Sequence, residues 1–319
     1  MKGEATVILP TLSEARAGLA LESLGAQTAG HQTIVVDNGS PGGEVADVCA
    51  EFDFVESIVP GKNIGFSRAV NVAARHALGD VLVIVNDDAI YEPDFVSSII
   101  EPIDPERGVT MAAAVLRSDR DSSRIDTAGI EIDRTLLAFD YLHGQLVSDA
   151  YAAGDPLGPS GAAAAYDRRS FLAIGGYDER LFAYFEDLDL ALRMRLAGSC
   201  CLLCPQAQGT HAHSSTLGSG SREKNRLLGF ARGYLLRKWA VLRPSRAPGV
   251  AVRELVLCLG QMMMDRNTGG LRGRLDGFRA AGAPGRQAFP EALVQDQATM
   301  TLRDSLGRRL GRRRALRSI

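Results

Sequence analysis

Short apolar runs alternate with helical patterns through the first third of the chain. The predicted strands cover residues 5–9, 33–36, 55–59 and 81–85. The predicted helices cover residues 13–23, 44–51 and 67–78. Strands that alternate with helices usually form a parallel sheet with helices on both faces, and nearly all-apolar strands are typical of such a sheet. The pattern therefore predicts an α/β fold with a mainly parallel, Rossmann-like sheet.

The middle of the chain has a weaker pattern. A strand is predicted over residues 111–116, but residues 117–155 are polar and irregular, with only short β-like pieces. We expect this segment to hold a mobile loop or an insertion that faces a substrate. Clearer signals return with a short helix over 168–174 and a strand over 200–204.

Beyond residue 221 the pattern is helical and basic. An apolar stripe at helical spacing is formed by Leu227, Leu228, Ala231, Leu235 and Trp239. Such a stripe is typical of core packing, and the Arg and Lys residues between its members leave contact with an anionic membrane open as the alternative. We therefore expect a helical, basic region over 221–319 to follow a larger domain over 1–220.

Composition is that of a soluble globular protein. The chain has 319 residues, of which 45% are hydrophobic and 23% charged, and its formal net charge is −2. The charge is uneven, because residues 303–319 contain seven Arg and one Asp, a local +6 that leaves −8 for the rest. This tail favours a membrane surface or an acidic partner, and no zinc-finger, zipper or RNA-binding pattern supports nucleic acid.

The five cysteines show no disulfide framework. Cys201 and Cys204 have the spacing of half a zinc site, but no second pair accompanies them, so we interpret them as reduced, buried thiols. The chain opens on a strand without a basic and apolar leader, from which we expect no export signal and a cytoplasmic location. Residues 255–264 are the most apolar stretch, which we expect to be too short to span a bilayer.

Polar residues follow several of the predicted strands. Thr11 comes after the first strand, Asp37 after the second, and Asn86, Asp87 and Asp88 after the fourth. Ligands bind beyond the carboxyl ends of strands in sheets of this kind. A single Asp there is usually only a turn former or helix cap, so the repetition carries the argument. No GxGxxG follows the first strand and no GxxxxGK[ST] occurs, which leaves a dinucleotide or P-loop cradle unsupported.

A second acidic cluster opens the helix that begins near residue 186. Glu186, Asp187 and Asp189 lie within four residues, and Leu188, Leu192 and Leu196 follow at a spacing of four. Acids at a helix N-terminus are favoured by the helix dipole, so an ordinary surface helix is the simpler interpretation. His211 and His213 follow the strand over 200–204, and with two acidic clusters in the chain a metal role and a structural role both stay open.

Taken in order, these pieces resemble glycosyltransferase family 2, the inverting enzymes of the GT-A fold, and in particular its bacterial rhamnosyltransferase-like members. The resemblance covers residues 5 to about 216, and the ordered set is specific where any one motif is weak. The matching segments are residues 7–11, 35–40, 63–66 with Asn71, 85–89, 175–179 with Phe182, 184–190 with Arg193, and His211 with Ser214.

The resemblance implies roles for the matched residues. The nucleotide would be held by Pro10, Thr11, Asp37, Asn63, Arg68, Asn86, Asp87 and Asp88. Asp88 corresponds to the metal-binding aspartate of the family's Asp-x-Asp motif, in which Asn86 here replaces the first aspartate. His211 would be a further metal ligand, with His213 as the alternative. Asp187, beside Glu186, matches the catalytic base.

The resemblance implies an inverting transferase that uses a UDP- or dTDP-sugar and Mg²⁺ or Mn²⁺. Residues 1–110 would form the donor half of the catalytic domain and 111–220 the acceptor half. The acceptor would be a glycan or lipid-linked saccharide at the inner membrane surface, contacted through the basic tail, and the C-terminal helices could pair two chains. The chemistry agrees, because a cation neutralises a departing nucleoside diphosphate while a carboxylate on the opposite face of the sugar deprotonates the acceptor hydroxyl.

Two other functions stay open at this point. A sugar nucleotidyltransferase shares such a sheet, but it would need a Gly-rich loop with Arg and Lys after the first strand, and residues 9–16 contain none. A non-catalytic nucleotide-sugar or glycan binding module is the other, if Asn86 reflects a weakened metal site. Binding measurements with UDP and dTDP, with and without Mn²⁺, separate these functions.

Overall fold

A nine-stranded mixed sheet forms the centre of the protein in the computed structural model, which describes residues 4–211, 220–282, 287–301 and 304. The strand order is β3-β2-β1-β4-β10-β6-β11-β5, and β7 pairs with β6. The strands are β1 (Ala5–Thr11), β2 (His31–Asp37), β3 (Val55–Ile58), β4 (Val81–Val85), β5 (Ala89–Tyr91), β6 (Val109–Ser118), β7 (Asp121–Thr127), β10 (Ala163–Asp167) and β11 (Cys200–His211).

The N-terminal half of this sheet confirms the predicted α/β alternation. Strands β1 to β4 pair in parallel, and Thr11 lies opposite Asp37 at the ends of β1 and β2. The helices between them are α1 (Glu14–Gly25), α2 (Glu44–Cys49) and α3 (Phe66–His76), and α4 (Phe95–Ile100) follows β5. One apolar core joins one face of the sheet to α3, and a second joins the other face to α1 and α4. The strand ends therefore share one edge, as the sequence predicts.

The rest of the sheet is less parallel than expected. Strand β10 runs antiparallel to both β4 and β6, and β5 runs antiparallel to β11. Ala163, the first residue of β10, lies opposite Val85, the last residue of β4. Because the chain enters β10 at the end where β4 finishes, the new strand must run back along it. An apolar run such as Ala163–Asp167 carries no signal for this direction.

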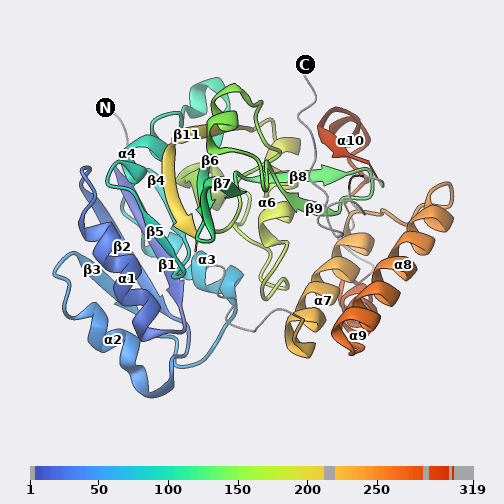
Figure 1. Ribbon diagram of the computed structural model, residues 1–319, viewed down its shortest axis with the longest axis horizontal. Helices are drawn as coiled ribbons and strands as arrows, with labels where there is room; N and C mark the ends of the chain where they lie inside the picture. The colour runs from blue at the N-terminus through green and yellow to red at the C-terminus, as the bar shows by residue number, and fades with distance from the viewer. Residues whose placement is uncertain (1–3, 212–219, 283–286, 302–303, 305–319) are drawn as a thin grey trace.

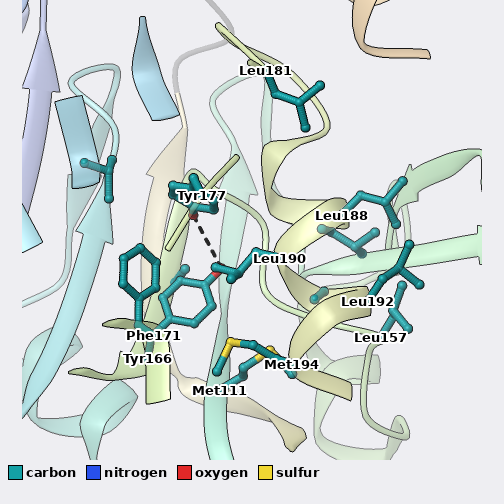
Figure 2. Close-up of a cluster of buried hydrophobic side chains, with 14 of the residues drawn as sticks. Met111, Leu157, Tyr166, Phe171, Tyr177, Leu181, Leu188, Leu190, Leu192 and Met194 are labelled. Atoms are coloured by element: carbon teal, nitrogen blue, oxygen red, sulfur yellow. Dashed lines mark hydrogen bonds between the residues drawn. The ribbon is translucent and has the colours of Figure 1, made fainter. Parts of the chain in front are cut away.

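Helix α6 (Glu186–Leu196) is buried on several sides (Figure 2). Of the three leucines at a spacing of four, Leu188 and Leu192 are fully buried, but Leu196 is 53% exposed where the helix ends. Leu190 and Met194 also lie in the core. Around α6 lie Tyr166 of β10 and Tyr177, whose hydroxyls are 3.4 Å apart, and Phe171 of α5 (Arg168–Ala173). This packing fixes the N-terminus of α6 against the sheet.

The C-terminal region forms a helical group on one side of the molecule (Figure 1). It contains α7 (Arg222–Lys238), α8 (Ala247–Asp265), α9 (Gly269–Ala280) and α10 (Glu291–Gln297). The region is not wholly helical, because β12 (Ala298–Met300) pairs with β8 (Ile130–Asp133), which in turn pairs with β9 (Ala138–Asp140). Three short 3₁₀ turns cover Pro41–Gly43, Pro105–Arg107 and Val147–Ala152. Residues of the two predicted regions thus share a small sheet.

Glycines allow α7 and α9 to approach closely. A β-carbon on Gly229 or Gly233 of α7 would overlap with the α9 backbone, and one on Gly273 or Gly277 of α9 would overlap with that of α7. Both pairs are spaced four apart, so each helix presents a continuous small-residue stripe. The glycine repeat is visible in the sequence of both helices.

The expectation that no apolar segment is long enough to span a bilayer was wrong for α8. By length and composition alone, its 19 residues are long and apolar enough to do so, with a mean hydropathy of 1.2. Charges at Arg253 and Glu254 had suggested a shorter run. His213 and the arginine-rich residues 305–319 lie outside the described residues, so the expectations for them stay predictions.

Candidate active site

A pocket of about 730 Å³ opens at the edge where the first strands end. This volume is in the usual range for a small-molecule site. Its walls come from the loops after β1 and β4, the approach to α6, strands β8 and β9, and the start of α7. The predicted site residues in its lining are Pro10, Thr11, Asn63, Asn86, Asp87, Asp88, Glu186, Asp187 and His211. The two acidic clusters and the histidine, far apart in sequence, therefore lie around one pocket.

Two strand ends are tied together by Asp87. The Thr11 hydroxyl donates a hydrogen bond of 2.6 Å to the Asp87 carboxylate, and the Arg16 guanidinium lies 3.4 Å from the same oxygen. Burial raises the pKa of Asp87, and the Thr11 hydrogen bond and the charge of Arg16 oppose that rise. Asp87 thus holds the loops after β1 and β4 in register.

The segment around Gly65 connects the loop after β2 to the loop before α6. The Asn38 side chain accepts a hydrogen bond from the Ile64 amide, and the Asn63 side chain accepts one from the Gly65 amide. Phe66 donates its amide to the Phe182 carbonyl at 2.7 Å. Gly65 has a φ of +85°, and a β-carbon there would lie 2.6 Å from that carbonyl oxygen. Only glycine fits this contact.

Two predicted site residues do not line the pocket. Asp37 is buried, and its carboxylate accepts hydrogen bonds from the Gly39 and Ser40 amides and the Ser40 hydroxyl. That arrangement shapes the turn after β2. Arg68 is exposed, and its guanidinium lies 3.7 Å from Glu179 on the outer side of α3.

His211 lies between two carboxylates. Its Nε2 is 3.0 Å from Asp88, and its Nδ1 is 2.7 Å from Asp126 of β7. Burial alone would lower the pKa of His211, but the hydrogen bonds to Asp126 and Asp88 outweigh burial and raise that pKa to about 10. The imidazole therefore carries a proton at neutral pH when only these two acids contact it. His211 is also the last residue of β11 instead of following a shorter strand.

The donor set fits a divalent cation that is shared with a substrate. Asp88 and His211 present one oxygen and one nitrogen at the pocket wall, and no group of three potential His, Cys, Asp or Glu ligands occurs in the described part of the chain. Mg²⁺ is commonly held by one or two protein ligands plus substrate phosphates and water. Asp126 completes a carboxylate–histidine pair of the kind that orients metal-bound imidazoles. Cation binding at Nε2 would release the proton of His211.

The approach to α6 is strained, and it aims Glu186 and Asp187. Tyr184 and Phe185 both have positive φ values, 73° and 62°, which are unfavourable for side chains of this size. Asp187 accepts hydrogen bonds from the Gly161 amide at 3.1 Å and from its neighbour Leu188 at 2.7 Å. Backbone outliers of this kind cluster at functional sites.

Burial changes the protonation of both acids. Burial raises the pKa of Asp187 despite the hydrogen bond from Gly161, and the nearby charge of Asp140 adds to the rise. Burial and the charge of Asp187 raise the pKa of Glu186 well above its usual range. Asp187 is then a carboxylate with more basic character than an exposed aspartate, which suits the removal of a proton from a hydroxyl.

The third acid of the cluster has a structural role. The Asp189 side chain is fully buried and points away from the pocket, between α6 and α7. Its carboxylate accepts hydrogen bonds from Lys238 at 2.9 Å, from the Trp239 indole at 3.0 Å and from Arg193 at 2.8 Å. The acidic cluster therefore divides into two residues at the pocket and one that joins the C-terminal region to the sheet domain.

Several residues of the site were missed in the sequence. Asp140 lines the pocket, and Asp126 contacts the pocket residue His211. Both acids lie in the irregular segment 117–155, where no periodic pattern singles out one acid from another. Lys224 and Leu227 enter from the first turns of α7, which the sequence analysis placed in a separate region. Leu227 was predicted as part of an apolar stripe, and the only signal for Lys224 was the position of a basic residue near a predicted helix start.

Two solved structures have a similar fold. One is "Crystal structure of GalNAc-T7 with UDP, GalNAc and Mn2+", with a TM-score of 0.59 and 15% identity, covering 74% of this chain and 48% of that one. Another is a mannosyltransferase from Pyrobaculum calidifontis in complex with GDP-Man and Mn2+, with a TM-score of 0.53 and 17% identity, covering 98% of this chain and 80% of that one. At these identities the likeness shows the fold alone, which is the GT-A fold.

The chain belongs to glycosyl transferase family 2, whose model matches residues 6–172. It is 25% identical over 209 residues to an N-acetylglucosaminyl-diphospho-decaprenol L-rhamnosyltransferase of Mycobacterium tuberculosis, covering 57% of this chain and 67% of that protein. It is also 27% identical over 243 residues to the uncharacterized protein y4gI of Sinorhizobium fredii, covering 70% of this chain but only 26% of that protein. The predicted family and its rhamnosyltransferase-like relatives are confirmed.

Proposed function

We propose that this glycosyltransferase inverts the anomeric centre while it moves a sugar from a UDP- or dTDP-sugar to a hydroxyl of a glycan or lipid-linked saccharide. The observation that carries the proposal is that Asp88 and Asp187 line one pocket. Asp88 would then bind the cation that neutralises the leaving group, and Asp187 would deprotonate the acceptor hydroxyl. The reaction would take place in the cytoplasm at the inner membrane surface, and the similarity to a transferase named for a lipid-linked acceptor supports that acceptor class.

The donor would occupy the side formed by the loops after β1 and β4. Thr11, Asn63 and Asn86 line that side, and the Asp87 contacts hold it in place. Asp88 and His211 would hold Mg²⁺ or Mn²⁺ together with the donor diphosphate. The cation, when bound, would neutralise the charge that develops on the departing nucleoside diphosphate.

Asp187 is the proposed general base. The raised pKa of its buried carboxylate allows it to take the proton of the acceptor hydroxyl as the oxygen attacks the anomeric carbon. Attack from the face opposite the nucleotide inverts the configuration, as in single-displacement sugar chemistry. The Gly161 amide positions Oδ2 of Asp187.

Asp187→Asn tests the assignment. Removal of the base should lower transfer about a hundredfold or more while UDP or dTDP binding in the presence of Mn²⁺ stays nearly unchanged. Asp94→Asn, an exposed acid outside the pocket, is the matched control. Sugar transfer would be followed by nucleoside diphosphate release from a panel of activated sugars, and binding by calorimetry.

The outcomes separate the alternatives. Full activity of Asp187→Asn would remove the base assignment. Nucleotide binding by the unaltered protein, with no turnover on any donor and acceptor tested, would favour a non-catalytic binding module instead.

A further inference from the structure

Helix α8 has an inverted distribution of polar and apolar side chains. Its exposed face carries six large apolar residues with between 48% and 81% of their surface exposed: Val252, Leu255, Val256, Leu259, Met263 and Met264. Apart from Met264, they recur at spacings of three and four, so they form one stripe along the helix. No exposed position of Ala247–Asp265 is charged. Surface helices of soluble domains normally show the opposite arrangement.

The polar side chains of α8 face the protein. Glu254 forms ion pairs of 2.8 Å with both Arg232 of α7 and Arg274 of α9. Arg253 pairs with Asp133 at the end of β8. These contacts fix the rotation of α8 about its axis, and they leave the apolar stripe turned outward.

The packing of the neighbouring helices has the same character. Glycines four apart bring α7 and α9 into backbone contact, and polar side chains hold α8 to both of them. Small residues and interhelical polar contacts are the means by which helices pack where apolar side chains gain nothing from turning inward, as in lipid. Helix α9 also exposes an apolar stripe, formed by Leu271, Leu275 and Phe278.

Charge is divided sharply between the two parts of the chain. Residues 221–319 contain 21 Lys and Arg against 7 Asp and Glu, a net charge of +14. Residues 1–220 contain 15 against 31, a net charge of −16. Figure 1 shows α8 and α9 at the side of the molecule away from α2 and β3. An apolar face within a strongly basic region complements an anionic lipid surface.

We infer that the outward face of α8 inserts into the headgroup and acyl boundary of an anionic bilayer leaflet. The helix lies along the membrane instead of crossing it, because Glu254 and Arg253 keep its other face bonded to the folded protein. At 1.5 Å per residue the helix offers a contact about 28 Å long. The inference concerns a surface distant from the proposed chemistry and is tested without donor or acceptor.

A second copy of the chain is the less favoured occupant. Two α8 faces in contact would bring together two basic regions, because the described residues beyond 220 carry 13 Lys and Arg against 7 Asp and Glu, a net charge of +6. Two such regions repel each other at low salt. In an anionic bilayer, the acyl chains would contact the apolar face and the negatively charged headgroups would contact the basic side chains of the region.

Vesicle flotation of the full chain tests the inference. The unaltered protein should bind phosphatidylcholine vesicles that contain phosphatidylglycerol more tightly than vesicles of phosphatidylcholine alone. The variant Leu255→Glu with Leu259→Glu should lose about tenfold or more of its binding to both, because each substitution removes a leucine from apolar contact. The matched control is Leu19→Glu with Leu78→Glu, two exposed leucines in the acidic part of the chain, and this variant should bind as the unaltered protein does.

Further measurements separate α8 from the alternatives. Replacement of Arg312, Arg313 and Arg314 by Gln should weaken binding to the anionic vesicles only. If that variant loses all binding while Leu255→Glu with Leu259→Glu keeps it, the tail is the anchor and the inference is wrong. A dimer in sedimentation experiments that disappears in the α8 variant would identify a second copy as the occupant, and absence of vesicle binding by the unaltered protein would also overturn the inference.

Discussion

The buried carboxylate of Asp189 gives the sharpest prediction for stability. Its side chain has no exposed surface, and it contacts Lys238, Arg193 and the Trp239 indole. Asp189→Asn keeps the shape but removes the negative charge that balances two cations, each with only 11% to 12% of its side chain exposed. Breaking a buried ion pair on one side usually costs about 3–5 kcal/mol.

The expected loss lies near the lower end of that range. Lys238 keeps a second partner, because its ammonium group also lies 2.7 Å from Asp178. Arg193 keeps hydrogen bonds to the Ile174 and Gly176 carbonyls. We therefore expect Asp189→Asn to lower the free energy of unfolding by about 3 kcal/mol.

Trp239 provides the assay. It is the single tryptophan of the chain and is fully buried, so its fluorescence during urea unfolding reports on the site itself. Glu291→Gln, which alters a carboxylate about half exposed in pairs with Arg243 and Arg246, is the control and should move the midpoint much less. A loss below about 1 kcal/mol for Asp189→Asn would refute the reasoning, because it would mean that the network contributes no more than an exposed ion pair.

Three further predictions concern the pocket. Because burial raises the pKa of Asp187, kcat/KM should rise with pH through an acid limb whose apparent pKa lies above that of an ordinary aspartate. An apparent pKa typical of an exposed aspartate would contradict the buried environment of Asp187. Asp126→Asn should weaken Mn²⁺ binding about tenfold to a hundredfold by calorimetry, whereas Asp121→Asn, an exposed acid five positions away, should leave it unchanged. Gly65→Ala should lower the free energy of unfolding by about 1–3 kcal/mol and weaken nucleotide binding, because its β-carbon would meet Phe182. Gly61 also has a positive φ but lies in open space, so Gly61→Ala should cost less. Equal effects of the two substitutions in thermal unfolding would argue against the contact.

The first half of the fold could be predicted because each apolar strand there is bounded by turn residues and followed by a helix. Asp88, Asp187 and His211 were predicted from motif order, and the structure places all three at one pocket. The position of Asp88 at the pocket follows from the strand ends that share one edge of the sheet. Nothing in the sequence fixes the distance between Asp88 and Asp187, which depends on the antiparallel return of β10 and on the strained residues before α6.

The remainder could not be read from sequence for identifiable reasons. Asp126 lies in a segment without periodicity, 85 positions before its partner His211. Nothing in the sequence distinguishes Asp189 from its neighbours Glu186 and Asp187. Only the packing of α7 against α6 shows that the Asp189 side chain is turned inward. For α8 the period of the pattern is clear, but periodicity does not say which face is outward, and here the polar face is buried by ion pairs.

The pairing of β12 with β8 has a consequence for synthesis of the chain. Thr299 donates a hydrogen bond of 2.7 Å to Glu131 across 168 positions. During translation β8 emerges long before its parallel neighbour β12 exists. One edge of β8, which carries Ile130 of the pocket lining, therefore stays open until β12 is made. A chain released early from the ribosome would have the pocket wall formed by the loops after β1 and β4 but an incomplete small sheet opposite it, and the uncovered edge of β8 would be open to chaperones or proteases.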